Sequence, residues 1–262
     1  MRESTPGHWQ RFWEEAARHG LDDVYDNDGR LIREIVALGD LTGRRILEVG
    51  AGTGRDAVAL ARAGAEVVTI DYVPGSLRLT CRAARDADVP MAPVCGDGLR
   101  MPFADATFDV VFHQGLLEHF RDPLPLLSEN VRVLRPGGVL LVDVPQTFHY
   151  YTLGKQVLIR LNRWFAGWET QFTISRLETL LQTAGTTVIR SYGDWMVPGL
   201  WYRALRKLVL RRTGRRLPRD PEPLWPCGPL GRVWRRRFGG TRLSLYTTPT
   251  IGCLGRKPGG AR

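Results

Sequence analysis

The chain has 262 residues, of which 43% are hydrophobic and 24% are charged. A chain of this length and composition can bury a full core in one or two domains, which excludes the collagen-like, low-complexity and disordered classes. No apolar run approaches the roughly 20 residues that span a bilayer. The first 30 residues hold more acidic than basic side chains and no apolar signal-peptide core, so we expect a cytoplasmic protein.

The net charge of +10 belongs to one segment of the chain. Residues 200–242 hold thirteen Arg or Lys against only Asp220 and Glu222, so the rest of the chain is nearly balanced. Four cysteines, Cys81, Cys95, Cys227 and Cys253, lie far apart and lack the CxxC or histidine spacing of a zinc site. We therefore expect reduced thiols, with neither a metal site nor a disulfide framework.

Short β-branched runs alternate with helical stretches between Arg44 and Val144, which is typical of βαβ units and a parallel sheet. Strands are predicted over 46–49, 67–70, 92–95, 108–112 and 139–144, with helices over 55–63, 77–86 and 125–134. Pro136-Gly137-Gly138 is expected to end the last of these helices. The pattern then predicts a helix over 175–184, a strand over 187–192 and one or two strands within 243–254. A Trp-rich helical region, with Trp9, Trp13, Leu31, Ile32, Ile35 and Val36, precedes the sheet.

The strongest motif is ILEVGAGTG at 46–54, where a strand leads into a glycine-rich turn and then a helix. Glycines at this spacing let the backbone turn sharply and let a ligand approach without a Cβ. A dinucleotide fingerprint starting at Gly50 would need a glycine at position 55, which is Arg55, so a nicotinamide oxidoreductase is disfavoured. Asp71 ends the second strand, where an acidic side chain can accept both ribose hydroxyl protons.

Five motifs in this order resemble the class I S-adenosylmethionine-dependent methyltransferases: Glu48-x-Gly50-x-Gly52-x-Gly54, Asp71, Gly96-Asp97-Gly98, Phe108-Asp109-Val110-Val111 and Leu134-Arg135-Pro136-Gly137-Gly138. The resemblance covers about residues 40 to 192 and, more weakly, the terminal strands. Within the superfamily, the chain is similar to the small-molecule branch related to ubiquinone-biosynthesis methyltransferases. This resemblance implies a Rossmann-like α/β fold whose seven-stranded, mostly parallel sheet has the order 3-2-1-4-5-7-6 and is flanked by helices.

The resemblance also implies a domain organisation. Residues 1–40 are expected to form an N-terminal helical cap, residues 41–194 and 241–262 the methyltransferase domain, and residues 195–240 a basic amphipathic insertion. The cap and the insertion are expected to roof the active site together.

S-adenosyl-L-methionine is the cofactor that the resemblance implies. Its methionine end is expected on Glu48, Gly50, Gly52 and Gly54, its ribose on Asp71, and its adenine among Tyr72, Asp97, Gly98 and Leu99, while His113 and Gln114 face the transferred methyl group. A sulfonium methyl donor is already activated, so the protein is expected to supply alignment, desolvation and one base rather than a metal or a covalent residue.

Candidate general bases follow the fourth and fifth strands, at the carboxyl edge where open α/β sheets hold their ligands. They are His113, Glu118, His119 and His149. Glu118 and His119 can also be interpreted as a polar pair at the start of a helix. The run Glu118-His119-Phe120 is similar to cyclopropane-fatty-acid synthases, in which the acidic residue helps hold a bicarbonate base.

The basic insertion contains two amphipathic repeats. Leu200, Trp201, Ala204, Leu205, Leu208 and Val209 recur at helical spacing beside Arg203, Arg206, Lys207 and Arg211, and Leu230, Val233, Trp234 and Phe238 repeat the pattern. Three interpretations are open: a lid over the active site, contact of residues 196–238 with an anionic membrane, or binding of a phosphate-bearing substrate or RNA. The second would make the cytoplasmic protein peripheral at the membrane.

The predicted reaction is methyl transfer from S-adenosylmethionine to an O, N or C nucleophile of a small hydrophobic or anionic metabolite, such as a lipid, quinone or glycan precursor. One alternative is an RNA methyltransferase that uses the basic insertion, and another is a non-catalytic partner that retains the cofactor pocket. Phe112-His113-Gln114-Gly115 follows the fourth strand in place of an Asn-Pro-Pro-aromatic run, which argues against nucleobase chemistry.

Overall fold

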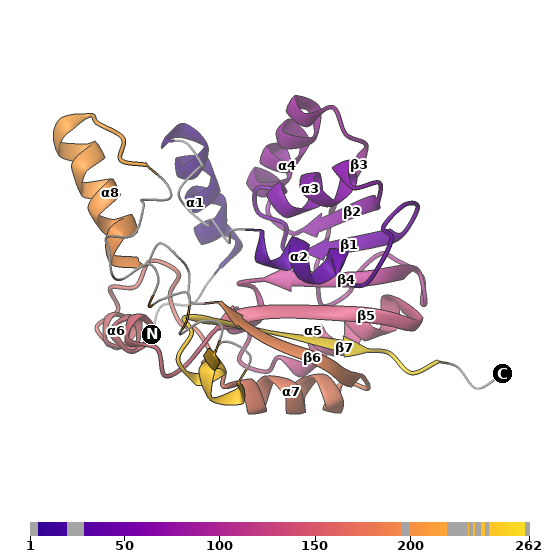
Figure 1. Ribbon diagram of the computed structural model, residues 1–262. Coiled ribbons are helices and arrows are strands. Elements are labelled where there is room, and N and C mark those ends of the chain that lie inside the picture. The colour runs from indigo at the N-terminus through magenta and orange to yellow at the C-terminus, as the bar shows by residue number, and fades with distance from the viewer. Residues whose placement is uncertain are drawn as a thin grey trace.

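The computed structural model describes residues 5–19, 29–194, 200–218, 230, 233, 237–238 and 241–259. Of the second amphipathic repeat of the insertion, Leu230, Val233 and Phe238 are described and exposed, whereas Trp234 lies outside the described residues. Within them, helices cover both faces of one seven-stranded sheet (Figure 1). No helix in this part of the chain is both long and apolar enough to cross a bilayer.

The sheet has the order β3-β2-β1-β4-β5-β7-β6, which confirms the predicted topology. Its strands are β1 (Arg45–Val49), β2 (Glu66–Asp71), β3 (Met91–Cys95), β4 (Phe108–Gln114), β5 (Leu134–Pro145), β6 (Thr187–Asp194) and β7 (Thr250–Arg256). Only β7 runs antiparallel to its neighbours, β5 and β6. The other neighbouring strands pair in parallel, so their carboxyl ends meet at one edge of the sheet.

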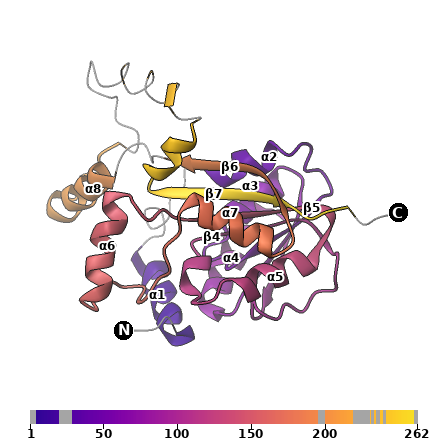
Figure 2. The same ribbon diagram turned by 90° about the horizontal axis from the view of Figure 1, so that it is seen from below.

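Alternate residues of the central strands belong to two hydrophobic cores on opposite faces of the sheet. Val110 and Phe112 pack with helices α2 (Arg30–Val36) and α3 (Arg55–Arg62), whereas Val111 packs with α5 (Leu124–Val133) and α7 (Ile174–Thr183). Figure 2 looks onto the face that α5 and α7 cover. The remaining helices are α1 (Pro6–His19), α4 (Pro74–Ala87), α6 (Tyr150–Arg160) and α8 (Leu200–Thr213), with 3-10 turns η1 (Leu117–His119) and η2 (Arg242–Tyr246).

The structure differs from, or adds to, the local expectations at three places. Pro136-Gly137-Gly138 lies inside β5 rather than after a helix, because α5 ends at Val133 and the chain enters the strand at once. The one or two strands predicted within 243–254 are a single strand, β7, and the residues before it form η2, since Thr241 caps a short helical turn by accepting from Ser244 N. Helix α6 was not predicted, because its exposed face is apolar and its buried face includes Thr152 and Lys155, so the usual contrast between a polar outer face and an apolar inner face is missing.

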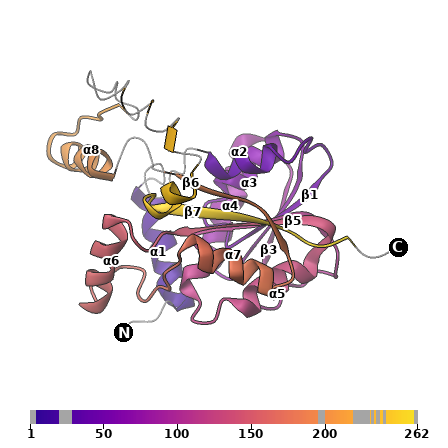
Figure 3. The ribbon, with the colours of Figure 1, turned by 60° about the horizontal axis from the view of Figure 1, so that its bottom comes forward.

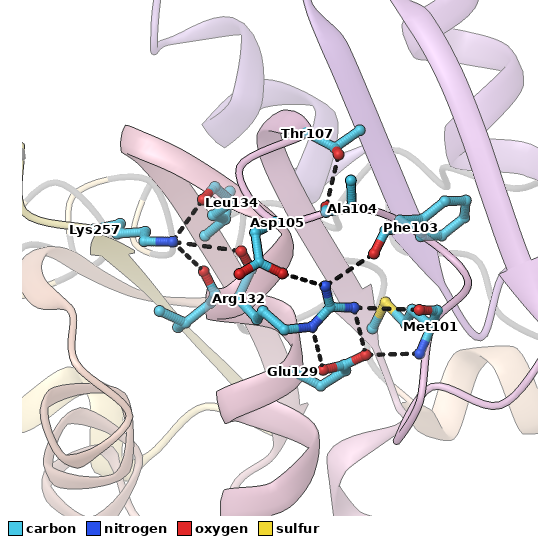
Figure 4. Close-up of polar contacts among 10 residues, drawn as sticks. Met101, Phe103, Ala104, Asp105, Thr107, Glu129, Arg132, Leu134 and Lys257 are labelled. Atoms are coloured by element: carbon cyan, nitrogen blue, oxygen red, sulfur yellow. Dashed lines mark hydrogen bonds and ion pairs between the residues drawn. The ribbon is translucent and has the colours of Figure 1, made fainter.

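Two cationic side chains fix the edge of the sheet opposite the carboxyl ends (Figure 4). Arg132 donates to both carboxylate oxygens of Glu129, to Asp105, and to the main-chain oxygens of Met101 and Phe103. Lys257 Nζ donates to Val131 O at 2.8 Å and to Leu134 O at 2.7 Å, across the junction of α5 and β5. These bonds hold the loop before β4 and the chain after β7 onto α5, which leaves the carboxyl edge for ligands.

Candidate cofactor and acceptor site

The glycine turn after β1 lies at the carboxyl edge of the sheet. Its backbone conformation and its close neighbours leave no room for a side chain at its glycine positions. Gly50, Gly52 and Gly54 adopt φ values of 68°, 55° and 70°, in the left-handed region that favours glycine. A Cβ on Gly52 would lie 2.8 Å from the indole ring of Trp13 in α1, and a Cβ on Gly54 would lie 2.8 Å from Thr80 Cγ2. The predicted cradle for the methionine end is therefore formed by bare backbone.

Two buried carboxylates brace this turn. Asp71, at the end of β2, accepts from Ser76 Oγ at 2.7 Å, from Val73 N at 2.9 Å and, at 3.3 Å, from Gly52 N. Burial raises the pKa of Asp71. Glu48 Oε2 accepts from Ala57 N at 3.2 Å in the first turn of α3, and burial together with the charge of Asp56 holds the Glu48 pKa well above its usual range. Glu48 thus supports the turn from behind, while Asp71 holds it from the side of β2.

The predicted adenine residues lie after β2 and β3. Tyr72 and Leu99 are exposed, and Leu99 N donates to Asp97 Oδ1 at 2.9 Å. Burial raises the pKa of Tyr72 to about 12, with contributions from the charges of Asp71 and Asp97, so the phenol lies near both acids. A Cβ on Gly98 would lie within 3.3 Å of Leu126 and Val49. Exposed apolar side chains beside a carboxylate, next to a bare-backbone cradle, fit an adenosyl group with a polar tail.

His113 and Gln114 end β4, and His113 is wholly buried. Neither ring nitrogen of His113 has a hydrogen-bond partner among the described residues, and burial lowers its pKa to about 3. Burial also lowers the pKa of His119 to about 4, and its ring lies 4.9 Å from that of Trp9 in α1. Both imidazoles are therefore neutral near pH 7.

Glu118 differs from the two histidines in its electrostatics. It is buried in η1, and burial, followed by the negative charge of Glu169, raises its pKa to about 8 against the opposing effect of Lys155. No described group donates to Glu118 Oε2. A carboxyl group with this pKa exchanges its proton near neutral pH, as a general base or acid requires.

Lys155, Trp164 and Glu169 are site residues that the sequence reasoning missed. Lys155 Nζ forms a buried ion pair with Glu169 Oε2, and Trp164 Nε1 donates to Glu169 Oε1 at 2.6 Å. Thr170 N donates to Glu118 O at 2.6 Å, which ties this segment to η1. Their sequence context could have drawn attention to Lys155 and Glu169. Glu169 follows 23 residues, 146–168, that contain no acid, and Lys155 is one of only three lysines in the chain.

His149 is not joined to this group by any of its described contacts. Its Nδ1 accepts from Tyr151 N at 3.3 Å and its ring lies 4.1 Å from that of Tyr150, so it caps the start of α6. The structure therefore brings Glu118 and His119 together with Lys155 and Glu169, and leaves His149 as the cap of a neighbouring helix.

Helix α1 lies against both halves of the site. Its Gln10 Oε1 accepts from Gly75 N at 2.9 Å, Trp13 covers Gly52, and Trp9 contacts His119. Phe12 stacks on Phe165, with the ring centroids 5.5 Å apart. These contacts place aromatic side chains over the glycine turn and over the acid-base group, by which we mean Glu118 and His119 with the neighbouring Lys155 and Glu169. At both places they exclude water.

The nicotinamide alternative finds little support in this geometry. Tyr151 and Lys155 stand at the Tyr-x-x-x-Lys spacing of some nicotinamide oxidoreductases, yet Lys155 Nζ is paired with Glu169 and the turn lacks a glycine at position 55. Within the described part of the chain, no three His, Cys, Asp or Glu side chains lie close enough to hold a metal ion.

Comparison with known proteins agrees with the geometry. Residues 47–142 match the family described as Methyltransferase domain. The chain is 39% identical over 106 residues, 40% of its length and 43% of the relative's, to a demethylmenaquinone methyltransferase of Renibacterium salmoninarum. It is 29% identical over 178 residues to a ubiquinone biosynthesis O-methyltransferase of a Ruegeria species, covering 66% of this chain and 72% of that one.

A solved structure shows the same fold. It is a proposed sarcosine dimethylglycine methyltransferase from Galdieria sulphuraria, with a TM-score of 0.62, 20% identity and coverage of 88% of this chain and 85% of that one. The chain spans about half the length of the demethylmenaquinone methyltransferases that it matches.

Proposed function

We propose that this chain, which contains a class I S-adenosylmethionine-dependent methyltransferase domain, methylates an O, N or C nucleophile of a small, lipophilic, quinone-type acceptor. The observation that best supports the proposal is the bare glycine turn hydrogen-bonded to Asp71 at the carboxyl edge of a sheet with this strand order. The names of the curated relatives support the acceptor class.

In this proposal, one set of residues binds the cofactor and another accepts the proton that the acceptor loses. S-adenosylmethionine, when bound, supplies a methyl group that its sulfonium charge already activates. The turn from Gly50 to Gly54 approaches the methionine end, Asp71 holds the ribose, and Tyr72 and Leu99 cover the adenine. The 3.3 Å bond from Gly52 N is the weakest that Asp71 accepts, so a ribose hydroxyl can replace it at little cost.

The acceptor side of the site supplies a base and excludes water. Glu118 takes the proton that the acceptor loses, and the Lys155–Glu169 pair sets the charge around it. Trp9 and Trp13 of α1 keep water from the reacting atoms, where a fixed geometry replaces solvent reorganisation. His113 and Gln114, at the end of β4, stand where the transferred methyl group is expected.

Cofactor binding tests the first half of this proposal. We expect calorimetry to show micromolar binding of S-adenosylmethionine or its demethylated product, and Asp71→Ala to weaken it by about 1 to 3 kcal/mol, because the ribose hydroxyls lose their acceptor. Asp86→Ala, on the exposed face of α4, is the control for loss of one carboxylate and should bind as wild type does. Heat from NAD but from neither S-adenosyl compound would contradict the assignment.

Methyl transfer itself is tested with a cofactor that has an isotope-labelled methyl group. Candidate acceptors are a naphthoquinol and a hydroxylated benzoquinol that each lack the methyl group, with bulk RNA as the rival substrate. Label in the organic extract supports a quinone-type acceptor, whereas label in RNA supports the RNA alternative. Cofactor binding without transfer to any of them would favour a non-catalytic partner.

We also propose that residues 196–238, within the basic insertion, contact an anionic membrane. Its described part includes α8, with Leu205 and Leu208 exposed on one side and Arg212, Arg215 and Arg216 exposed at and just after its end, and also the exposed Leu230, Val233 and Phe238. Apolar side chains beside arginines suit the boundary between headgroups and acyl chains. Such contact would bring the protein to the place where a lipophilic acceptor dissolves.

A further inference from the structure

We propose that α6 joins α8 in a single docking surface for an anionic lipid membrane, and that the exposed face of α6 supplies a continuous apolar part of that surface. The inference rests on the membrane contact proposed above and extends it to a helix outside the basic insertion. Helix α6 follows β5 and belongs to the predicted methyltransferase domain, outside residues 196–238 for which membrane contact is proposed above.

The outer face of α6 is an apolar stripe. Tyr150, Leu153, Val157 and Leu161 follow one another at intervals of three and four residues, and each is between 53% and 64% exposed. The opposite face of the same helix, with Thr152, Lys155 and Ile159, is buried against the protein. Globular proteins seldom leave a contiguous apolar stripe on a helix in water, so this face fits a partner.

The two segments that contain α6 and α8 carry charge of one sign. Residues 146–168 and 195–219, which include α6 and α8, contain no Asp or Glu. Arg160 and Arg163 are exposed at the end of α6, and Arg212, Arg215 and Arg216 are exposed at the end of α8. An apolar stripe with exposed arginines at its end and no acid in its own segment is complementary to a surface of acyl chains and anionic headgroups.

The two helices also stand at the same end of the molecule. In Figure 1 and again in Figure 3, α6 and α8 lie beyond the carboxyl ends of the strands, on the side where α1 covers the site. Lys155, on the inner face of α6, pairs with Glu169 beside Glu118. Helix α6 therefore has its apolar face outside and its site residue inside, so a lipid-borne acceptor would reach the acid-base group across one helix.

Other occupants fit this surface less well. A second copy of the chain would bring an equally basic surface against it, and like charges oppose that contact. RNA would be drawn to the arginines, but single-stranded nucleic acid stacks on successive aromatic rings, whereas Tyr150 is the one aromatic residue of the stripe and the other three are aliphatic. The membrane is the occupant that uses both the charge and the apolar stripe.

Co-sedimentation of the full chain with vesicles tests the inference. Wild type should bind vesicles of mixed phosphatidylglycerol and phosphatidylcholine, and Leu153→Ser/Val157→Ser should bind them about tenfold or more weakly, because two aliphatic anchors are lost. The control Val36→Ser/Ile189→Ser makes the same change at exposed positions in α2 and β6, and should bind as wild type does. All four positions are exposed, so the variants should fold, and denaturant unfolding confirms it.

The charged part of the surface is tested separately. Arg160→Gln/Arg163→Gln should weaken binding, and salt should release wild type as the Debye length falls from about 30 Å at 0.01 M to about 3 Å at 1 M. Pure phosphatidylcholine vesicles should bind the wild-type chain weakly.

The outcomes separate the proposals. If wild type binds and the Leu153→Ser/Val157→Ser variant binds equally well, α6 takes no part and this inference is overturned, while contact through the insertion stands. If wild type binds no vesicles, both membrane proposals fall, although cofactor calorimetry still decides the methyltransferase proposal. If wild type sediments as a dimer and the Leu153→Ser/Val157→Ser variant as a monomer, a second copy of the chain covers the stripe and the membrane inference is overturned. If wild type binds RNA but no vesicles, the nucleic-acid alternative is favoured.

Discussion

Replacing Asp143 by alanine is expected to lower the free energy of unfolding by about 3 to 5 kcal/mol. Asp143 lies on β5, and its carboxylate accepts from Arg30 Nε at 2.8 Å and from Arg30 Nη2 at 2.6 Å. Tyr192 OH of β6 donates to the same carboxylate at 2.9 Å. All three side chains are buried, so the variant would leave a buried guanidinium without the carboxylate that accepts two of its hydrogen bonds. Chemical denaturation of the cofactor-free protein at neutral pH measures the change.

A double replacement separates the cost of breaking the pair from the value of having it. Arg30→Met/Asp143→Leu removes both charges, and should be less destabilised than Asp143→Ala alone, because no unpaired ion remains. Arg62→Ala, on the exposed end of α3, should change the free energy of unfolding by no more than about 0.5 kcal/mol. A loss below about 1 kcal/mol for Asp143→Ala would mean that the interior relaxes around Arg30 or admits water.

Local patterns explain why the cofactor side could be predicted from the sequence. The glycine turn and the carboxylate of Asp71 depend on residues that follow each strand directly, so their order along the chain already indicates their place in a parallel sheet. The order of the strands came with the resemblance. The two buried cores follow from the alternation of residues such as Val110 and Val111 along a strand with helices on both sides.

Long-range pairs explain what could not be predicted. Arg30 and Asp143 are 113 residues apart, and Lys155 and Glu169 are 14 apart on either side of an irregular segment. Neither pair has a fixed spacing that a single sequence could reveal. The sequence pattern allows Glu118 to be a base or one half of a polar pair at a helix start. Its burial in a 3-10 turn beside Glu169 depends on how the segment after α6 folds against that turn, which no local pattern indicates.

Replacing Glu118 by glutamine is expected to reduce methyl transfer by about 100-fold or more while cofactor binding is retained. The pKa of Glu118 is raised to about 8, first by burial and then by Glu169, so the basic carboxylate form becomes more abundant as pH rises. Wild-type kcat/KM should therefore increase up to about pH 8 and then level off, and the glutamine variant should lack this rise. His149→Ala, at the cap of α6, should keep the wild-type pH profile if proton transfer belongs to Glu118.

Neighbouring charges should shift this profile in opposite directions. Lys155→Met removes the positive charge that opposes the raised pKa, so the rise in kcat/KM should move to higher pH. Glu169→Gln removes the negative charge that raises it and leaves Lys155 unpaired, so the rise should move to lower pH. Shifts in the same direction for both variants would show that packing, rather than charge, controls the group.

The same proton should be visible in stability, without an acceptor. A carboxyl group whose pKa is raised on folding stabilises the protein fully at pH values below its ordinary pKa, and this contribution is lost as pH rises through the folded-state value of about 8. Relative to Glu118→Gln, the wild-type free energy of unfolding should therefore fall by up to about 1.4 kcal/mol per pH unit between pH 6.5 and 8. His113 and His119 are present in both proteins, so their titration cancels in the comparison. Parallel stability curves for the two proteins would mean that Glu118 is already ionised at neutral pH, and a base with an ordinary pKa would then have to explain any rise in turnover.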